Sequence, residues 1–372
     1  MTELNRRDAI RVVVGAGAAL YTGCQPGKKD AVMEETAEVT GIVELPPSPT
    51  PWPTRDPFLF CVHHLDLYPK GNAECGPRAS LQGRQMGQDF AGVDGWRMYH
   101  GMTVPGFPSH PHRGFETVTV VRQGLLDHAD SMGAAARYGE GDVQWLTAGA
   151  GIQHSEMFPL LKQDESNPVE LFQIWLNLPK RNKFAKPHFS MLWDHQVPTL
   201  QASPEGGEIR VVAGALHDAV PGSPPPDSWA SDPQSDVAIW TLRLEANAQC
   251  RLPPAKPGTL RSLYFFAGSH MQVGGQSIGS GHRIDVEADR MLPIQNASTP
   301  AQVLVLQGRP IAEPVAQHGP FVMNSTREIQ QAIFDYQRTQ FGGWPWDKRD
   351  PVHGREPGRF ALFADGRREE PG

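Results

Sequence analysis

Two short motifs, well separated along the chain, constrain the fold of this sequence more than any other feature. The first contains His110 and His112, and the second contains His154 and Glu156, with one residue between the members of each pair. On a β-strand, side chains two residues apart point to the same face of the sheet. Each pair can therefore face one ion from its own strand, and the spacing predicts two strands on either side of a metal site.

The residue types in these motifs limit which metal the site suits. Three imidazoles and one carboxylate form a mixed nitrogen and oxygen set that favours a first-row transition ion such as Fe(II). Four ligands also leave room for water, O₂ or a substrate oxygen. Glu116 is an alternative to Glu156 as the acidic ligand, or an acceptor for an imidazole N–H.

The segments around the motifs have the composition of strands. Residues 116–121 are rich in β-branched side chains, and residues 142–147 alternate polar and apolar side chains before a glycine-rich turn. We therefore expect both motifs in one antiparallel sheet system. His63 and His64 are adjacent, so on a strand they face opposite sides and cannot bind one ion in the same way. We leave this pair out of the site.

At these residues the chain resembles the pirin family, a branch of the cupin superfamily. The resemblance runs from about Asp56 to Trp346, and the blocks that carry it are 110–117, 141–149, 151–157, 172–178, 308–314 and 319–324. It implies a bicupin fold and the iron ligands His110, His112, His154 and Glu156. The activities recorded in the family are quercetin 2,3-dioxygenase and iron-dependent modulation of nuclear transcription factors.

Length and composition agree with two domains rich in turns. At 372 residues, the chain exceeds what one hydrophobic core usually serves, and it contains 38 Gly and 35 Pro. We expect an all-β fold with two tandem cupin (double-stranded β-helix, or jelly-roll) domains and a short C-terminal helix. The expected segments are an export signal (1–24), a Pro/Glu-rich linker (25–55), a metal-binding cupin domain (56–200), a second cupin domain without a metal site (201–346) and a mobile tail (347–372).

The second domain is predicted from a further run of strand-like segments. These segments are 207–214, 237–244, 263–267 and 302–306. No His-x-His pair falls among them, so we expect one metal ion per chain. A capping box at residues 325–328 then predicts a helix that closes at Gly342–Gly343. Its apolar stripe is Ile329, Ala332, Ile333 and Tyr336.

The amino terminus has the pattern of an export signal. Arg6 and Arg7 precede a weakly apolar run over 12–20, which is too short to span a bilayer. We interpret it as a twin-arginine signal, and the alternative is a disordered basic tail on a cytoplasmic protein. Residues 22–24 also resemble the end of a lipoprotein signal, so Cys24 is a candidate lipid anchor for a periplasmic or cell-surface protein.

The net charge of the chain limits the partners that it can bind. The net charge of −7 and the lack of a basic cluster in the body of the chain argue against direct nucleic acid binding. We expect contact with a membrane only through the N-terminal lipid, and the sequence does not identify a protein partner.

Cys61 and Cys75 either pair in an oxidising compartment or remain free buried thiols.

The function expected from the resemblance is dioxygenation of a flavonol-like, quercetin-type substrate with O₂. Fe(II) is the preferred metal, with Mn, Ni, Cu, Co and Zn as alternatives. Glu156 is the candidate base for the substrate hydroxyl, with Glu116 as second choice. An aromatic-accepting pocket is expected from Phe107, Phe115, Trp145 and Met157. The alternatives are a redox-responsive, metal-dependent binding protein and a scaffold that the metal only stabilises.

Overall fold

A computed structural model describes residues 36–356 and 358–372 of this chain. The predicted twin-arginine signal, Cys24 and the start of the predicted linker lie outside the described residues. No helix in the described ranges is long and apolar enough to cross a membrane.

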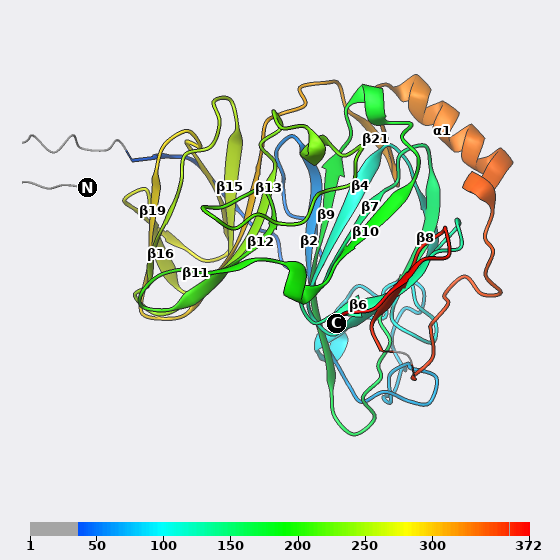
Figure 1. Ribbon diagram of the computed structural model, residues 1–372. Helices are drawn as coiled ribbons and strands as arrows, with labels where there is room; N and C mark the ends of the chain where they lie inside the picture. Colours follow the sequence, from blue (N-terminus) through cyan, green and yellow to red (C-terminus); the bar gives the residue numbers. More distant parts are fainter. Residues whose placement is uncertain (1–35, 357) are drawn as a thin grey trace, which may run out of the picture. The chain divides into compact units, whose positions relative to one another are not determined.

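The first barrel consists of two antiparallel sheets that face each other (Figure 1). One sheet contains, in spatial order, β10 (His188–Leu192), β7 (Val143–Thr147), β4 (Phe115–Gln123), β9 (Asn167–Asn177) and β2 (Phe58–Tyr68). The other contains β24 (Arg368–Glu369), β23 (Phe360–Leu362), β6 (Ala135–Gly139), β5 (Leu125–Asp130), β8 (Ile152–Met157) and β3 (Gly106–His112).

The second barrel repeats this architecture. Its larger sheet contains β1 (Val39–Glu44), β18 (His282–Val286), β15 (Leu260–Ala267), β20 (Ala301–Gly308), β13 (Ala238–Leu244), β12 (Gly207–Ala213) and β11 (Thr199–Gln201). Its smaller sheet contains β14 (Gln249–Leu252), β19 (Leu292–Asn296), β16 (His270–Val273) and β17 (Gln276–Gly279). The prediction of an all-β protein with two jelly-roll domains is confirmed.

Buried apolar side chains form three main clusters. One fills part of the first barrel and includes Leu146, and a second fills the second barrel and includes Trp240. The third joins the two barrels, with Val118 of β4 and Ile239 of β13 among its members. Strands β4 and β13 are therefore buried along most of both faces.

The three cysteines in the described residues are buried in the apolar clusters. Cys61 and Cys75 are buried and free, and they lie in different apolar clusters, so they do not pair with each other. Cys250 is also buried and free. The open alternative between a disulfide and buried thiols is thereby decided in favour of thiols.

Residues 36–55 of the segment expected to be a linker contribute to the fold. Strand β1 pairs with β18 at the edge of the second barrel, and Ala37 is fully buried in its core. Trp52 is also buried and stacks on Tyr264 at 5.6 Å. The proline and glutamate content of residues 25–55 obscured a β-branched run at 39–43, which is long enough to add an edge strand.

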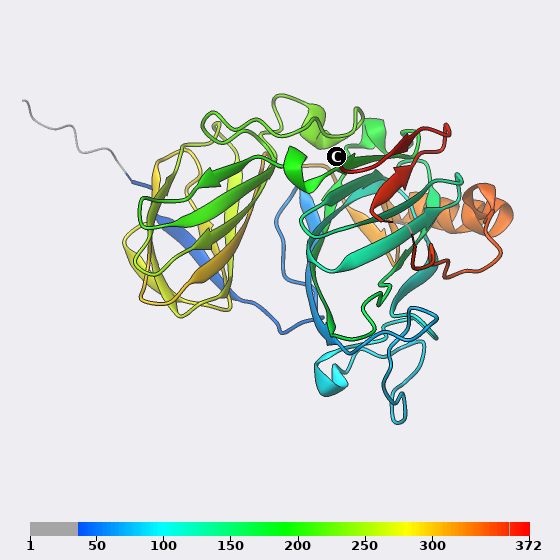
Figure 2. The ribbon, with the colours of Figure 1, turned by 60° about the horizontal axis from the view of Figure 1, so that its bottom comes forward.

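The C-terminal tail also differs from the expected mobile end. Strand β23 pairs with β6 of the first barrel, and Phe363 stacks on Phe189 with ring centroids 4.7 Å apart. Figure 2 shows these C-terminal strands, in red, against the first barrel. Mixed charges suggested a solvated end, but the apolar run 360–363 provides enough buried surface to hold the segment in place.

The predicted helix is α1 (Thr326–Thr339), and η5 (Gln340–Gly342) follows it. Ser325 caps it by accepting a hydrogen bond from the Glu328 backbone N–H, and the predicted stripe packs on β21 (Ala316–His318) and β22 (Phe321–Met323). The helix follows the second barrel in sequence but lies beside the first (Figure 1), where Asp335 pairs with Arg113 at 2.8 Å.

The remaining regular elements are short 3-10 turns. They are η1 (Val93–Gly95), η2 (Lys180–Asn182), η3 (Asp194–Gln196) and η4 (Trp229–Ser231). The turn η4 belongs to the proline-rich segment between β12 and β13, and it lies against the first barrel through a hydrogen bond from Ser228 to Glu116.

Candidate metal centre and cavity

The antiparallel pairing of β3 and β8 brings the two histidine motifs together. His110 lies opposite His154 in the register, and His112 follows on the same strand face as His110. Gly114 allows the chain to turn from β3 into β4, because its φ of 85° is left-handed and a side chain there would collide with the Val322 carbonyl. The turn places the motif at the inner wall of the barrel.

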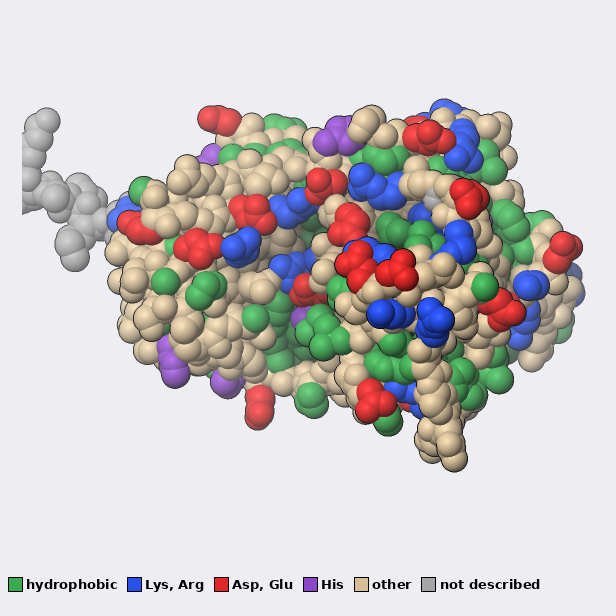
Figure 3. Space-filling model, turned by 90° about the horizontal axis from the view of Figure 1, so that it is seen from below, with side chains coloured by type: hydrophobic (Ala, Val, Ile, Leu, Met, Phe, Trp, Pro, Cys, Tyr) green, Lys and Arg blue, Asp and Glu red, His purple; other side chains and the backbone are tan. Residues whose placement is uncertain are grey.

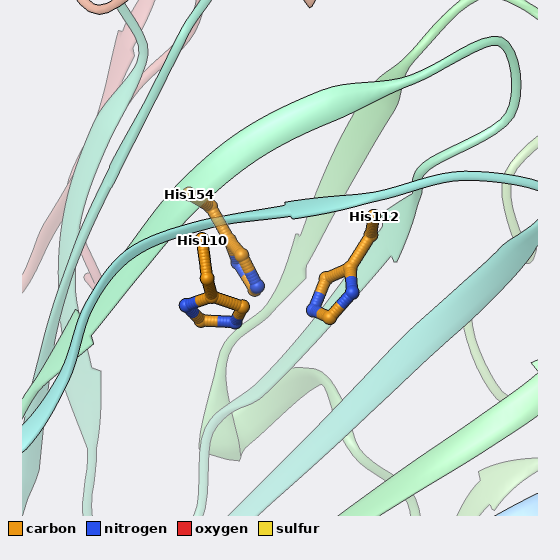
Figure 4. A group of neighbouring side chains, drawn as sticks. All are labelled: His110, His112 and His154. Carbon is orange, nitrogen blue, oxygen red and sulfur yellow. The ribbon is translucent and has the colours of Figure 1, made fainter. Parts of the chain in front are cut away.

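The three imidazoles converge on one point (Figure 4). Their ring centroids lie 4.5 Å apart for His110 and His154, 4.7 Å for His110 and His112, and 4.8 Å for His112 and His154. One ligand nitrogen from each ring lies within 4.8 Å of the others. The geometry therefore suits a divalent metal ion.

The hydrogen bonding of the rings also fits a metal. Both ring nitrogens of His154 and Nδ1 of His112 are buried without a hydrogen-bond partner among the described residues. The Nδ1–H of His110 donates to the Pro108 carbonyl at 2.9 Å, which leaves Nε2 as the available ligand atom. Burial lowers the pKa of His110 to about 4 and lowers the pKa values of His112 and His154 well below the ordinary value. Neutral imidazoles are the form that ligates metals.

Glu156 lies beside this cluster. Its Oε2 is 3.8 Å from Nε2 of His154, and the same oxygen accepts a hydrogen bond from Gln173 Nε2 at 2.9 Å. Thr119 donates to its Oε1 at 3.3 Å. Burial raises the pKa of Glu156, while the charge of His128 and the hydrogen bonds from Gln173 and Thr119 oppose that shift. The carboxylate is thus held at the edge of the histidine cluster.

Glu116 points away from the cluster. On β4, Thr119 faces the inside of the barrel, so Glu116, an odd number of residues away, faces the opposite side of the sheet. There it accepts hydrogen bonds from Thr147 at 2.6 Å and from Ser228 at 2.5 Å. Burial raises the pKa of Glu116 to about 7. Of the two candidate acids, Glu156 is the one that the fold places near the imidazoles.

A cavity of about 1170 Å³ opens onto the cluster. His110, His112 and Glu156 form part of its lining. Its apolar walls include Phe60, Val62, Phe107, Phe158, Leu171 and Trp175. Of the aromatic-accepting residues expected from the sequence, Phe107 lines the cavity, whereas Phe115, Trp145 and Met157 are buried in the surrounding core.

Several cavity residues were not singled out in the sequence. Gln173 donates to Glu156, and the Thr119 hydroxyl donates to Oε1 of Gln173 at 2.5 Å. Arg349 reaches the cavity from the C-terminal tail, where it donates to the Ser109 carbonyl at 2.7 Å. Polar residues on the inward face of an otherwise apolar strand were an available signal for Gln173. No local signal identified Arg349, because its position depends on the packing of the tail.

The fold and the histidine cluster define a two-domain cupin protein with a metal-type site in its first barrel. Two family profiles match the chain: Pirin over residues 76–176, and the Pirin C-terminal cupin domain over residues 239–342. The chain belongs to the pirin family.

Known relatives are consistent with this assignment. A Pseudomonas aeruginosa protein named "Putative quercetin 2,3-dioxygenase" is 36% identical over 238 residues, which is 63% of this chain and 79% of the relative. A Vibrio cholerae protein of the same name is 37% identical, covering 64% of this chain and 80% of the relative. Pirin-1 of Arabidopsis thaliana is 34% identical, covering 64% and 78%.

Solved structures show the same fold. The crystal structure of quercetin 2,3-dioxygenase from Acinetobacter baumannii superposes with a TM-score of 0.66 and 24% identity, covering 83% of this chain and 99% of that one. At this level of identity, the likeness establishes the two-cupin architecture.

Proposed function

We propose that this protein is a metal-dependent dioxygenase that acts on a flavonol-like, quercetin-type substrate. The observation that carries the proposal is a cavity with aromatic walls and a buried carboxylate that opens onto three converging imidazoles, two of which, His110 and His112, line it. Such a cavity suits a planar, hydroxylated aromatic molecule. The names of the Pseudomonas and Vibrio relatives support the same reaction class.

The proposed metal ligands are His110, His112 and His154, with Glu156 as the fourth. Fe(II) is the proposed ion, and Mn, Ni, Cu, Co or Zn are the alternatives, since the donor set is compatible with each. When bound, Fe(II) would act as a Lewis acid toward a substrate oxygen and provide redox chemistry with O₂.

The side chains of the protein supply the remaining steps. Glu156 would serve as a ligand before substrate binds and would then accept the proton of the substrate hydroxyl, because it is the carboxylate at the edge of the cluster that also lines the cavity. Gln173 and Thr119 orient it through their hydrogen bonds. Phe107 and Trp175 contribute aromatic walls against which a flat ring system packs and from which water is excluded.

A small-molecule substrate fits the surface better than a nucleic acid does. On the face shown in Figure 3, basic side chains are interspersed with acidic ones rather than gathered in one patch. The net charge of −7 agrees with this. We further propose export by the twin-arginine route, with Cys24 as the lipid-anchor candidate, on the strength of the N-terminal sequence.

The decisive experiment is aerobic turnover of quercetin by protein that has been reconstituted anaerobically with Fe(II). Flavonol absorbance and O₂ uptake are followed together in the wild type, His110→Ala and the control His270→Ala, whose histidine lies exposed on the second barrel. We expect turnover that disappears only in His110→Ala. Metal binding without O₂ uptake in the wild type would contradict the proposal and favour the redox-responsive binding protein.

A further inference from the structure

His64 lies on the wall of the same cavity, outside the metal cluster. On β2 the side chains of Phe60, Val62 and His64 line the cavity, whereas His63 faces the other side and pairs with Glu170 at 2.9 Å. His64 is only 6% exposed. It is therefore a buried polar group that the proposed reaction has not used.

A chain of hydrogen bonds fixes the proton on this imidazole. Arg97 donates to Oδ1 of Asp66 at 3.0 Å, and the Tyr99 hydroxyl donates to Oδ2 of Asp66 at 2.6 Å. The hydroxyl has one proton, so toward His64 its oxygen acts as an acceptor at 2.8 Å from Nδ1. His64 must therefore carry its proton on Nδ1, and Nε2 holds a lone pair.

The charges along this chain are consistent with that assignment. Burial raises the pKa of Asp66, but the hydrogen bond from Tyr99 and the charge of Arg97 oppose the shift and favour the carboxylate. Burial raises the pKa of Tyr99 well above its ordinary value, so the hydroxyl keeps its proton. Burial, and then the charges of His63 and Arg97, lower the pKa of His64 to about 3. The imidazole is thus a neutral acceptor.

The backbone holds Tyr99 in an unusual conformation. Its φ is 54°, in the left-handed region that favours glycine, and two backbone hydrogen bonds with Asp89, of 2.9 and 3.0 Å, keep it there. Such a conformation persists only where the surrounding structure enforces it. The hydroxyl that orients His64 is therefore rigidly placed.

An aromatic ring separates His64 from the metal cluster. The ring of Phe107 lies 5.8 Å from that of His64 and 6.4 Å from that of His110, between centroids. His64 also meets Tyr99 edge-on at 5.1 Å. His64 thus adds a polar position to an apolar stretch of the cavity wall, apart from the imidazole cluster.

We infer that His64 accepts a hydrogen bond through Nε2 from a second hydroxyl of the substrate while the first hydroxyl lies at the metal cluster. The site then selects planar aromatic compounds that carry hydroxyls at two separate positions. Tyr99 and Asp66 act as positioning residues, because they orient His64 rather than touch the substrate. This inference rests on the proposed function and specifies its substrate class.

The test compares two flavonols by equilibrium binding to the metal-loaded protein. Quercetin carries hydroxyls on its outer rings, whereas 3-hydroxyflavone has only the hydroxyl beside the ring carbonyl. We expect the wild type to prefer quercetin by about tenfold, the size of one buried hydrogen bond. His64→Phe keeps an aromatic ring against Tyr99 and Phe107 but removes both nitrogens, so the preference should vanish while 3-hydroxyflavone still binds. His63→Phe is the matched control and should retain the preference.

The outcomes separate this inference from the proposed function. If the wild type turns over quercetin and His64→Phe keeps the full preference, the role of His64 is overturned and the dioxygenase remains. If the wild type binds neither flavonol, both the role of His64 and the proposed dioxygenase function are wrong.

A spectroscopic measurement tests the proton position without relying on a variant of His64. In ¹⁵N NMR of the Zn(II)-loaded protein, we expect the His64 Nε2 signal of an unprotonated nitrogen, shifted when quercetin binds. Tyr99→Phe removes the hydroxyl that accepts the His64 Nδ1–H, so the ¹⁵N signals that report the His64 tautomer should change. If Tyr99 only supported the fold, these signals would stay the same. A protonated Nε2 in the wild type would overturn the inference.

Discussion

The two barrels share one architecture, yet their cavities differ in chemistry. The cavity of the first barrel is lined by His64, His110, His112 and Glu156 between aromatic walls. A cavity of about 780 Å³ on the second barrel is lined by Gln201, Gln249, Gln272 and Gln295, and His217 is the one histidine among its described lining residues. These glutamines are exposed on the outer face of their strands, whereas apolar side chains such as Met271 and Ile294 fill the interior of the second barrel. The comparison teaches that the same jelly roll can hold a polar cavity or a closed apolar core, depending on its inward-facing residues.

Removing a proposed ligand from the first barrel should have the largest effect. His154→Ala is expected to lower metal affinity by about 100-fold or more and to reduce quercetin turnover to background, because a fully buried imidazole is lost. Metal content and turnover are measured beside His270→Ala, the same change on the second barrel. An equal loss of metal and turnover in both variants would mean that the metal site is not confined to the first barrel.

Glu156→Gln should separate catalysis from metal binding within the first barrel. Turnover is expected to fall by about 1000-fold, because the amide cannot accept the substrate proton, while the three histidines still hold the metal. Glu116→Gln makes the same chemical change on the other face of the sheet and should leave turnover unchanged. Turnover is measured by steady-state kinetics, and the metal content of each variant is measured beside it. A large loss of turnover in Glu116→Gln would show that Glu116 also takes part in the reaction.

The pH dependence of stability tests the region where the barrels meet. Burial raises the pKa of Glu116 from 4.5 to about 7, so the folded state binds the proton more tightly than the unfolded state. This contribution to stability is complete below pH 4.5 and is lost as the pH rises through about 7, with a total of about 3 kcal/mol.

The measurement is denaturant unfolding of the wild type and Glu116→Gln across that pH range. The variant resembles the protonated carboxyl and should show a flatter profile. Identical slopes for the two proteins would show that Glu116 does not titrate in the folded state as described.

The smallest expected effect concerns the helix that follows the second barrel but packs beside the first. Ser325→Ala removes the cap of α1 and should lower the free energy of unfolding by about 1 kcal/mol. Metal affinity should remain unchanged, since the cap does not line the cavity. Ser277→Ala, at an exposed position on β17, is the control for unfolding measurements, and an equal loss there would exclude a capping effect.

Much of the fold was predictable because its signals are local. Alternation and β-branched runs predicted the strands, and the capping box at residues 325–328 predicted the helix. The i, i+2 spacing also placed His110 and His112 on one face. Strand β1 and the tail strand β23 were missed because their short apolar runs lie among prolines and charges, and each becomes a strand only by pairing with an edge far away in sequence.

The sequence by itself determined the jelly-roll class, the histidine motifs and the faces to which neighbouring side chains turn. Only the tertiary structure decided that Glu156 rather than Glu116 lies beside the imidazoles, and that His64 meets Tyr99. The reason is physical. A strand sets two faces through its period of two, but what packs on each face depends on contacts between segments that local patterns do not encode.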